Sequence, residues 1–360
     1  MSTNKSSQKG KLMSVKELNR KLEIARATKS NLLIRGPVGV GKTRIIEQFA
    51  ESKGVNCKTA TLYGDPISVL GIPKLNSEYT EFSKSFLIKD IEDHDIIFID
   101  EISNASIQSI SCIMQLLSDR EIGGHKIPPN VQIILACNGI QHSKAARAMP
   151  NALLNRVSIF DYDGPTGPEF TDYMLSNDWN PVLSSFLSKS PEMIIQKEIP
   201  DEQKPMYTPR SIESVNNLLN EFWDFSPEST NNIGSDIVER CGDVFYQRLR
   251  TYMELGVYLL DPLDIIKKPL DIDIKNIVKN ERVAWITLYS LVPLFEEKTA
   301  EAIASFIGRM TPENQWLFYM LLPEVKRAEW ANNDAAAVVL EKLIKKNKKL
   351  IHTIKGDTLT

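Results

Sequence analysis

The chain has 360 residues, 42% of them apolar, which is enough material for two or three domains with substantial hydrophobic cores. A net charge of −3 excludes a strongly basic protein whose overall field would attract nucleic acid or an anionic membrane. No apolar run approaches the roughly 20 residues of a membrane-spanning helix. The four cysteines contain no C-x-x-C pair and the four histidines no metal-binding cluster, so we expect a cytoplasmic protein without disulfides or zinc.

In chain order, the first half alternates short apolar runs with helical patterns, which is typical of a parallel sheet covered by helices. The polar, basic start at 1–13 is expected to be a disordered lead-in. Five strands are predicted at 31–36, 57–62, 95–100, 131–138 and 157–162. Helices are predicted at 42–52 and 106–119, the second with a stripe of Ile107, Ile110, Ile113, Met114 and Leu117 at helical spacing.

A turn-rich segment at 163–170 is a candidate domain boundary, because everything beyond it is helical in pattern. A second break at 260–274 divides this helical half. We therefore expect an α/β domain at 14–168, a helical lid at 169–260 and a C-terminal helical segment at 261–360. The last segment ends in a lysine-rich tail, for which a solvated, basic helix end is favoured over a binding site.

The segment GPVGVGKT follows an apolar strand and opens a helix, as the G-x-x-x-x-G-K-[ST] phosphate-binding loop requires. Its glycines allow backbone N–H groups to surround a phosphate, and the helix N-terminus adds a positive dipole end. Lys42 is placed to pair with β- and γ-phosphate oxygens, and Thr43 to ligate Mg²⁺. The alternative is a glycine-rich turn without a ligand. The predicted nucleotide-binding residues are Gly36, Pro37, Val38, Gly39, Val40, Gly41, Lys42, Thr43 and Arg44.

Two later predicted strands end in polar residues. Asp100 closes the strand DIIFID and is predicted to hold Mg²⁺, with Thr43 as the second protein ligand. Glu101, the next residue, can polarise an attacking water. Asn138 ends the strand VQIILACN, where an amide could orient the same water. The alternatives are solvated acids at a strand end and an ordinary turn asparagine.

The ordered series of phosphate loop, IFIDE, LACN, NALLNR and TPRS resembles the AAA+ superfamily of ATPases, and more narrowly its MoxR branch. The resemblance implies a five-stranded parallel sheet of order 5-1-4-3-2, followed by an all-α lid. It also implies a helix-2 insert at about 63–87 and a pre-sensor-1 hairpin at about 119–131. In that branch both inserts project over the pore of a ring, where a client could be engaged; the alternative is a pair of long solvated loops.

The resemblance also assigns roles to three arginines. Arg156 matches the arginine finger, which reaches the nucleotide of the neighbouring subunit and stabilises developing charge there. Arg210 matches the second sensor arginine, which acts on the nucleotide of its own chain. Arg147 is a candidate second trans arginine, with a surface charge as the alternative.

These features predict an oligomeric, Mg²⁺-dependent ATPase, expected to be a homohexameric ring, that remodels, assembles or activates a protein client. The MoxR resemblance implies a chaperone-like role, often beside a partner bearing a von Willebrand factor A (VWA) domain. One alternative is an AAA+ motor or loader acting on nucleic acid, against which the acidic net charge stands. Another is a structural subunit that binds ATP without useful turnover.

Overall fold

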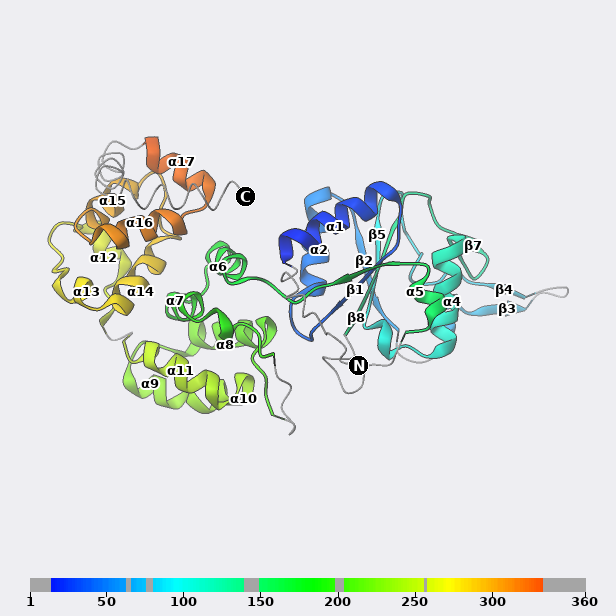
Figure 1. Cartoon of the computed structure of the whole chain (residues 1–360), viewed down its shortest axis with the longest axis horizontal. Coiled ribbons are helices and arrows are strands. Elements are labelled where there is room, and N and C mark those ends of the chain that lie inside the picture. Colours follow the sequence, from blue (N-terminus) through cyan, green and yellow to red (C-terminus); the bar gives the residue numbers. More distant parts are fainter. Residues whose placement is uncertain are drawn as a thin grey trace, which may run out of the picture. The chain divides into compact units, whose positions relative to one another are not determined.

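The computed structural model describes residues 14–62, 66–75, 80–138, 149–197, 204–255 and 258–332 (Figure 1). The chain divides after Thr166 into two compact units, and the short segment Thr208–Arg210 returns to the first unit. The predicted lead-in, Arg147 and the lysine-rich tail lie outside the described residues. Within the described ranges, no helix is long and apolar enough to cross a membrane.

The first unit contains a five-stranded sheet in which every neighbouring pair is parallel. Its order is β2-β5-β8-β1-β9, which confirms the order predicted from the sequence. The strands are β1 (Leu32–Gly36), β2 (Cys57–Thr61), β5 (Ile96–Asp100), β8 (Gln132–Asn138) and β9 (Ser158–Asp161). Because the strands are parallel, the residues that follow β1, β5 and β8 meet at one edge of the sheet.

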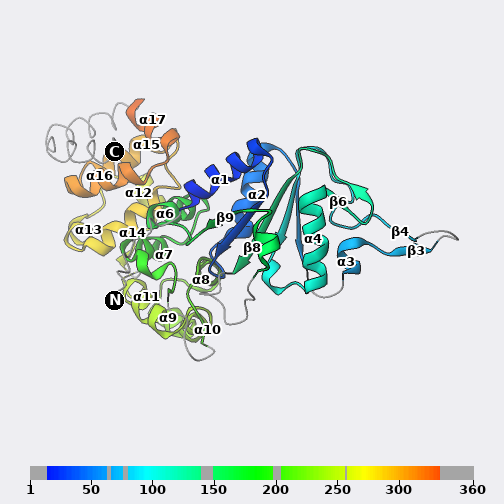
Figure 2. The same cartoon turned by 45° about the vertical axis from the view of Figure 1, so that its right-hand side comes forward.

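Helices cover both faces of this sheet, which explains why β5 and β8 are almost continuously apolar and buried. Figure 2 shows α1 (Val15–Thr28) and α2 (Lys42–Lys53) on one side and α4 (Ile107–Asp119) on the other. The Ser106 hydroxyl caps α4 by accepting from Ser109 N at 3.0 Å. The apolar stripe of α4 packs on the sheet from Ile110 onward, whereas Ile107, predicted to share the stripe, is 70% exposed.

Two small hairpins extend from the first unit. The first follows α3 (Ile67–Leu70) and pairs β3 (Pro73–Leu75) with β4 (Thr80–Phe82); the second pairs β6 (Glu121–Ile122) with β7 (His125–Lys126). The two glycines between β6 and β7 both have positive φ, as a two-residue hairpin turn requires. The hairpins contact each other, since His125 Nε2 lies 2.8 Å from the carbonyl oxygen of Phe82. Residues 63–65 and 76–79 of the predicted insert lie outside the described residues.

The second unit is helical and contains two apolar clusters. The first cluster involves α6 (Gly167–Ser176), α7 (Pro181–Lys189), α8 (Pro209–Phe222), α10 (Gly234–Cys241) and α11 (Asp243–Met253). A short helix, α9 (Pro227–Asn232), lies between α8 and α10 in the sequence. The second cluster involves α12 (Pro262–Lys267), α13 (Lys275–Lys279), α14 (Glu281–Leu291), α15 (Ala300–Ile307), α16 (Pro312–Leu321) and α17 (Glu324–Asn332).

The buried residues of the first cluster end at Met253, apart from Ile286, and those of the second begin at Ile265, close to the start of the predicted break at 260–274. That segment contains α12, in which Asp261 accepts from Leu263 N at 2.8 Å and Ile265 is fully buried. Ile286 of α14 also packs in the first cluster, so the two clusters share a helix. The division into a lid and a C-terminal segment therefore stays a prediction.

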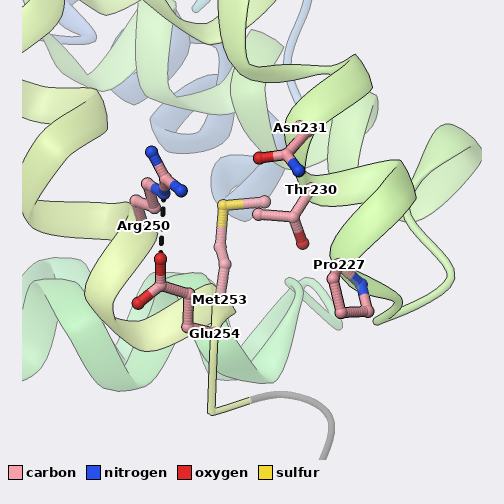
Figure 3. Close-up of a pocket in the computed structure, with 6 residues that line it drawn as sticks. All are labelled: Pro227, Thr230, Asn231, Arg250, Met253 and Glu254. Carbon is pink, nitrogen blue, oxygen red and sulfur yellow. Dashed lines mark hydrogen bonds and ion pairs between the residues drawn. The ribbon is translucent and has the colours of Figure 1, made fainter.

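A small pocket of about 120 Å³ lies in the second unit, between α9 and α11 (Figure 3). An ion pair lines it, in which Arg250 Nε lies 2.9 Å from Glu254 Oε1. Met253, Pro227, Thr230 and Asn231 complete the lining. The Thr230 hydroxyl is already engaged there by Trp223 Nε1 at 2.9 Å.

Candidate functional site

The predicted phosphate loop connects β1 to α2 at the carboxyl edge of the sheet. A side chain at Gly36 would place its Cβ 2.2 Å from the carbonyl oxygen of Tyr162, so only glycine fits against β9 there. Gly39 and Gly41 have φ values of 73° and 89°, in the left-handed region that favours glycine. The loop thus turns sharply and delivers the first turn of α2, with its unpaired N–H groups, to this edge.

Lys42, the first residue of α2, lies beneath the loop and is only 7% exposed. Its Nζ donates to the carbonyl oxygens of Gly36 at 3.0 Å and Pro37 at 2.8 Å, and to Asn138 Oδ1 at 3.2 Å. Burial lowers the pKa of Lys42 to about 8, although the nearby Asp100 carboxylate acts in the opposite direction. The ammonium group is therefore held by three neutral oxygens, which a phosphate could replace as a better partner.

Thr43 and Asp100 meet one residue further along α2. The Thr43 hydroxyl donates to Asp100 Oδ2 at 2.6 Å, and Glu101 N donates to Asp100 Oδ1 at 2.8 Å. A hydroxyl and a carboxylate oxygen at this separation are hard oxygen ligands, which Mg²⁺ prefers. Magnesium in such sites takes one or two protein oxygens and completes its shell with water and phosphate, so this pair fits the ion.

Glu101 follows Asp100 with a φ of 53°, so the backbone turns sharply at the strand end. This turn starts the 3-10 helix η1 (Ile102–Asn104). Asn104 Nδ2 donates to Glu101 Oε2 at 3.1 Å. Lys42, Thr43, Asp100, Glu101 and Asn138 thus come together from α2, β5 and β8, as parallel strand ends predict.

Comparison with known families agrees with this geometry. Residues 31–157 match the family model described as "AAA domain (dynein-related subfamily)". This segment is therefore similar to the AAA domains of the AAA+ superfamily. AAA+ domains are P-loop nucleotide-binding domains, which fits the loop and the strand-end carboxylates. The narrower MoxR resemblance stays a prediction.

Other comparisons add little. Among curated proteins no match is found. Similar solved structures include a mutant of RuvB from Thermotoga maritima, with 16% identity over 72% of this chain and 79% of that one and a TM-score of 0.37. Another is described as "RuvB Holliday junction branch migration motor" from the same organism, with 16% identity over 71% and 75% of the two chains and a TM-score of 0.35. Likeness at this level says nothing about ligands or partners.

The tip of the phosphate loop is held by the segment Thr208–Arg210. Arg210 N donates to the carbonyl oxygen of Gly39 at 3.2 Å, and a Cβ at Gly39 would lie 2.6 Å from the Thr208 hydroxyl oxygen. The Arg210 guanidinium is exposed, and its charge is one of the influences that lower the pKa of Lys42. Arg210 therefore lies near the loop and Lys42, and its role as a second sensor arginine stays a prediction.

Arg156 lies at the opposite edge of the sheet. Its carbonyl oxygen accepts from Asn31 Nδ2 at 3.1 Å, at the amino end of β1, whereas Lys42 binds Gly36 at the carboxyl end. At about 3.3 Å per residue, the five steps from Asn31 to Gly36 span roughly 16 Å. The Arg156 guanidinium donates to Ser118 Oγ at 2.5 Å and to the Ala152 carbonyl oxygen at 2.6 Å, and no carboxylate pairs with it in the described part of the chain. Arg156 is thus far from the Lys42 site of its own chain.

Sequence reasoning missed three residues that shape the site: Asn104, Thr208 and Tyr162. The signal for Asn104 was its position three residues after Glu101, the spacing of a single helical turn. The contacts of Thr208 and Tyr162 with the loop glycines join segments far apart in the sequence, and no local pattern indicates them. Arg44 is exposed, with Glu47 Oε2 4.0 Å from its Nη1, so its predicted role in nucleotide binding stays a prediction.

The lowered pKa of Lys42 predicts a pH dependence of nucleotide binding measured without Mg²⁺. Without nucleotide, Lys42 loses its proton as the pH rises through about 8, while a bound polyphosphate favours the charged form. Affinity should therefore fall above pH 8, by at most about tenfold per pH unit, and binding there should take up a proton. Calorimetry in buffers of different ionisation enthalpy measures this uptake, which should vanish in Lys42→Met. Equal affinity and no proton uptake between about pH 7 and about pH 9.5 would contradict the assignment.

Proposed function

We propose that the protein is an Mg²⁺-dependent ATPase that hydrolyses ATP to ADP and phosphate. The observation that carries this proposal is the meeting of Lys42, Thr43 and Asp100 under a glycine loop, with Glu101 directly beside them. A loop of this kind could also bind nucleotide without turnover. A carboxylate one residue beyond the metal ligand favours hydrolysis, because it can accept a proton from the attacking water.

Each side chain has a distinct task in this reaction. Lys42 exchanges its carbonyl partners for β- and γ-phosphate oxygens, and Thr43 with Asp100 would hold the magnesium ion. That ion supplies charge neutralisation on the phosphates when it is bound. Glu101 polarises water, Asn138 orients it and Arg210 neutralises charge on the γ-phosphate from within the same chain.

We further propose that the active form is a homo-oligomeric ring, of six subunits by analogy with the resembled family. The support is the position of Arg156 at the amino edge of the sheet, where its carbonyl oxygen binds Asn31. Lys42 of the same chain lies at the carboxyl edge, and the length of β1, roughly 16 Å, separates the two. A head-to-tail interface brings the amino edge of one subunit to the site of the next. Arg156 would then complete the neighbour's site by stabilising the charge that develops on its γ-phosphate.

The proposed outcome of the cycle is remodelling of a protein client, in a chaperone-like role of the MoxR type that could include a VWA-domain partner. The feature that supports a client is the pair of hairpins, which contact each other through His125 and the Phe82 carbonyl and so form one projection. Its exposed apolar side chains include Ile72 at 66% and Leu75 at 85%, which are suited to contact with a protein rather than with phosphates.

The first test of this function is the variant Glu101→Gln, which keeps the shape of the side chain and removes its basicity. We expect ATP binding to be unchanged and kcat to fall by at least about a hundredfold. Phosphate release measures turnover, and Glu121→Gln, an acidic residue of the β6–β7 hairpin, is the matched control. Wild-type protein that binds ATP but never releases phosphate would instead make the chain a nucleotide-gated structural subunit.

The same Glu101→Gln variant, held in its ATP-bound form, is the bait that tests the client. We expect it to retain a protein that the Lys42→Ala variant does not retain. Retention of nucleic acid instead, with the steep salt dependence of phosphate contacts, would replace the client proposal with the nucleic-acid alternative.

A further inference from the structure

Asn104 contacts the proposed catalytic carboxylate through both its backbone and its side chain. Asn104 N donates to the Glu101 carbonyl oxygen at 2.8 Å, and Asn104 Nδ2 donates to Glu101 Oε2 at 3.1 Å. The first bond closes the turn of η1, and the second holds the end of the glutamate side chain. Asn104 therefore binds both the backbone carbonyl and the side-chain carboxylate of Glu101.

The turn itself is fixed by packing, without help from the Asn104 amide. Ile102 and Ser103 are 0% and 2% exposed, and Ala105 after the turn is 1% exposed. Asn104 is the exposed member of this short segment. An exposed hydrogen bond of this kind contributes little to folding stability, so the fold does not depend on an amide at this position.

The Asn104 amide does restrict the torsions of the Glu101 side chain. The backbone of Glu101 is already fixed by its φ of 53° and by the bond from Glu101 N to Asp100 Oδ1. The side-chain torsions of Glu101 then decide where its carboxylate points relative to Lys42 and Thr43. A donor on Oε2 selects one rotamer and one rotation of the carboxylate plane.

We infer that Asn104 is a positioning residue for Glu101 in the hydrolysis reaction. This inference rests on the proposed function, because positioning has a consequence only if Glu101 acts as the base. A base must present an oxygen lone pair to the water within hydrogen-bonding distance, and rotamers that turn the carboxylate away do not react. Asn104 acts through Glu101 and makes its contribution before nucleotide binds.

Three substitutions of Asn104 distinguish the effect of its hydrogen-bond donor from the effects of side-chain shape and charge. Asn104→Ala removes the donor, and kcat should fall by about tenfold, the value of one hydrogen bond to a charged group. Asn104→Asp keeps the shape and places a second carboxylate against Glu101, so its kcat should fall further. Asn104→Gln keeps a donor on a longer side chain and should retain more activity than Asn104→Ala.

The matched control is Asn130→Ala, which removes a similar bond at the far edge of the sheet. Asn130 Nδ2 donates to Asp93 Oδ2 at 2.7 Å, next to the amino end of β8. The full-length variants are compared by kcat, KM, the Kd for ATP and the thermal midpoint. We expect an ordered loss in kcat at Asn104, an unchanged Kd, thermal midpoints like that of the control, and unchanged kcat in Asn130→Ala.

An unchanged or raised kcat in both Asn104→Ala and Asn104→Asp would overturn the inference, as would a loss explained by a raised Kd or by unfolding. Failure of the proposed function has a different signature. In that case wild-type protein shows no turnover, or Glu101→Gln turns over like wild type, and the inference falls with it. If turnover is lost in Glu101→Gln but kept in the Asn104 variants, the proposed ATPase function is supported. In that case only the inference about Asn104 is rejected.

Discussion

Lys42→Ala is expected to raise the Kd for ATP by about a hundredfold, the largest change in binding that we expect from one side chain. The reason is the geometry of the site, in which the ammonium group is buried and donates only to carbonyl and amide oxygens. A triphosphate offers it full negative charge in the same place. Titration of a fluorescent ATP analogue measures the change, and Lys58→Ala, whose Nζ donates to the Lys89 carbonyl oxygen at 2.7 Å, is the matched control.

This loss should occur without loss of the fold. A pKa of about 8, against a reference value of 10.5, means that the charged Lys42 destabilises the nucleotide-free protein by about 3 kcal/mol at neutral pH. That cost applies below pH 8 and disappears above 10.5, where the lysine is neutral in both states. Lys42→Met, which fills the space without the charge, should therefore keep or raise the thermal midpoint of the protein without nucleotide. A Kd for ATP in Lys42→Met close to that of wild type would contradict the role of the charge.

The parts of the fold and site that could be predicted from the sequence are those determined by neighbours along the chain. The loop between Gly36 and Thr43, the carboxylates after β5 and the amide after β8 each belong to one strand and its following turn. Parallel pairing then brings these ends together at one edge of the sheet, so their convergence follows from the strand pattern. The strand order came from the resemblance of the motifs, and the structure confirms it.

The parts that could not be predicted depend on contacts between distant segments or on residues with two common uses. Thr208 contacts Gly39 across about half of the chain, and nothing near either residue indicates it. Pro262 lies in a segment interpreted as a break, but proline is also favoured in the first turn of a helix, where its missing N–H costs nothing. The helix there is stabilised by the Asp261 cap and by the burial of Ile265. Burial depends on the tertiary fold, so the local sequence does not indicate it.

Arg156→Ala is expected to lower kcat by about a thousandfold or more while the Kd for ATP stays unchanged, as for other arginine fingers in phosphoryl transfer. The unchanged Kd follows from geometry, because Arg156 is at the amino edge of the sheet and Lys42 at the carboxyl edge. Arg156→Lys keeps the charge but loses the planar fork, and should recover little. Arg20→Ala, an exposed arginine on α1, is the control and should behave as wild type.

Mixing two inactive variants tests whether the arginine acts on the next subunit. An Arg156→Ala subunit keeps its Lys42, and a Lys42→Ala neighbour supplies Arg156, so one of the four pairings in a mixed ring has a complete site. Equal mixing should therefore restore about a quarter of the wild-type turnover if the sites act independently. A smaller recovery of turnover that depends steeply on the mixing ratio would indicate that the active sites of one ring are coupled. Any such recovery would still require active sites that two subunits share. No recovery at any ratio, in rings shown to contain both variants, would mean that each chain completes its own site, and Arg156 would then be a structural arginine that bonds Ser118 and the Ala152 carbonyl oxygen.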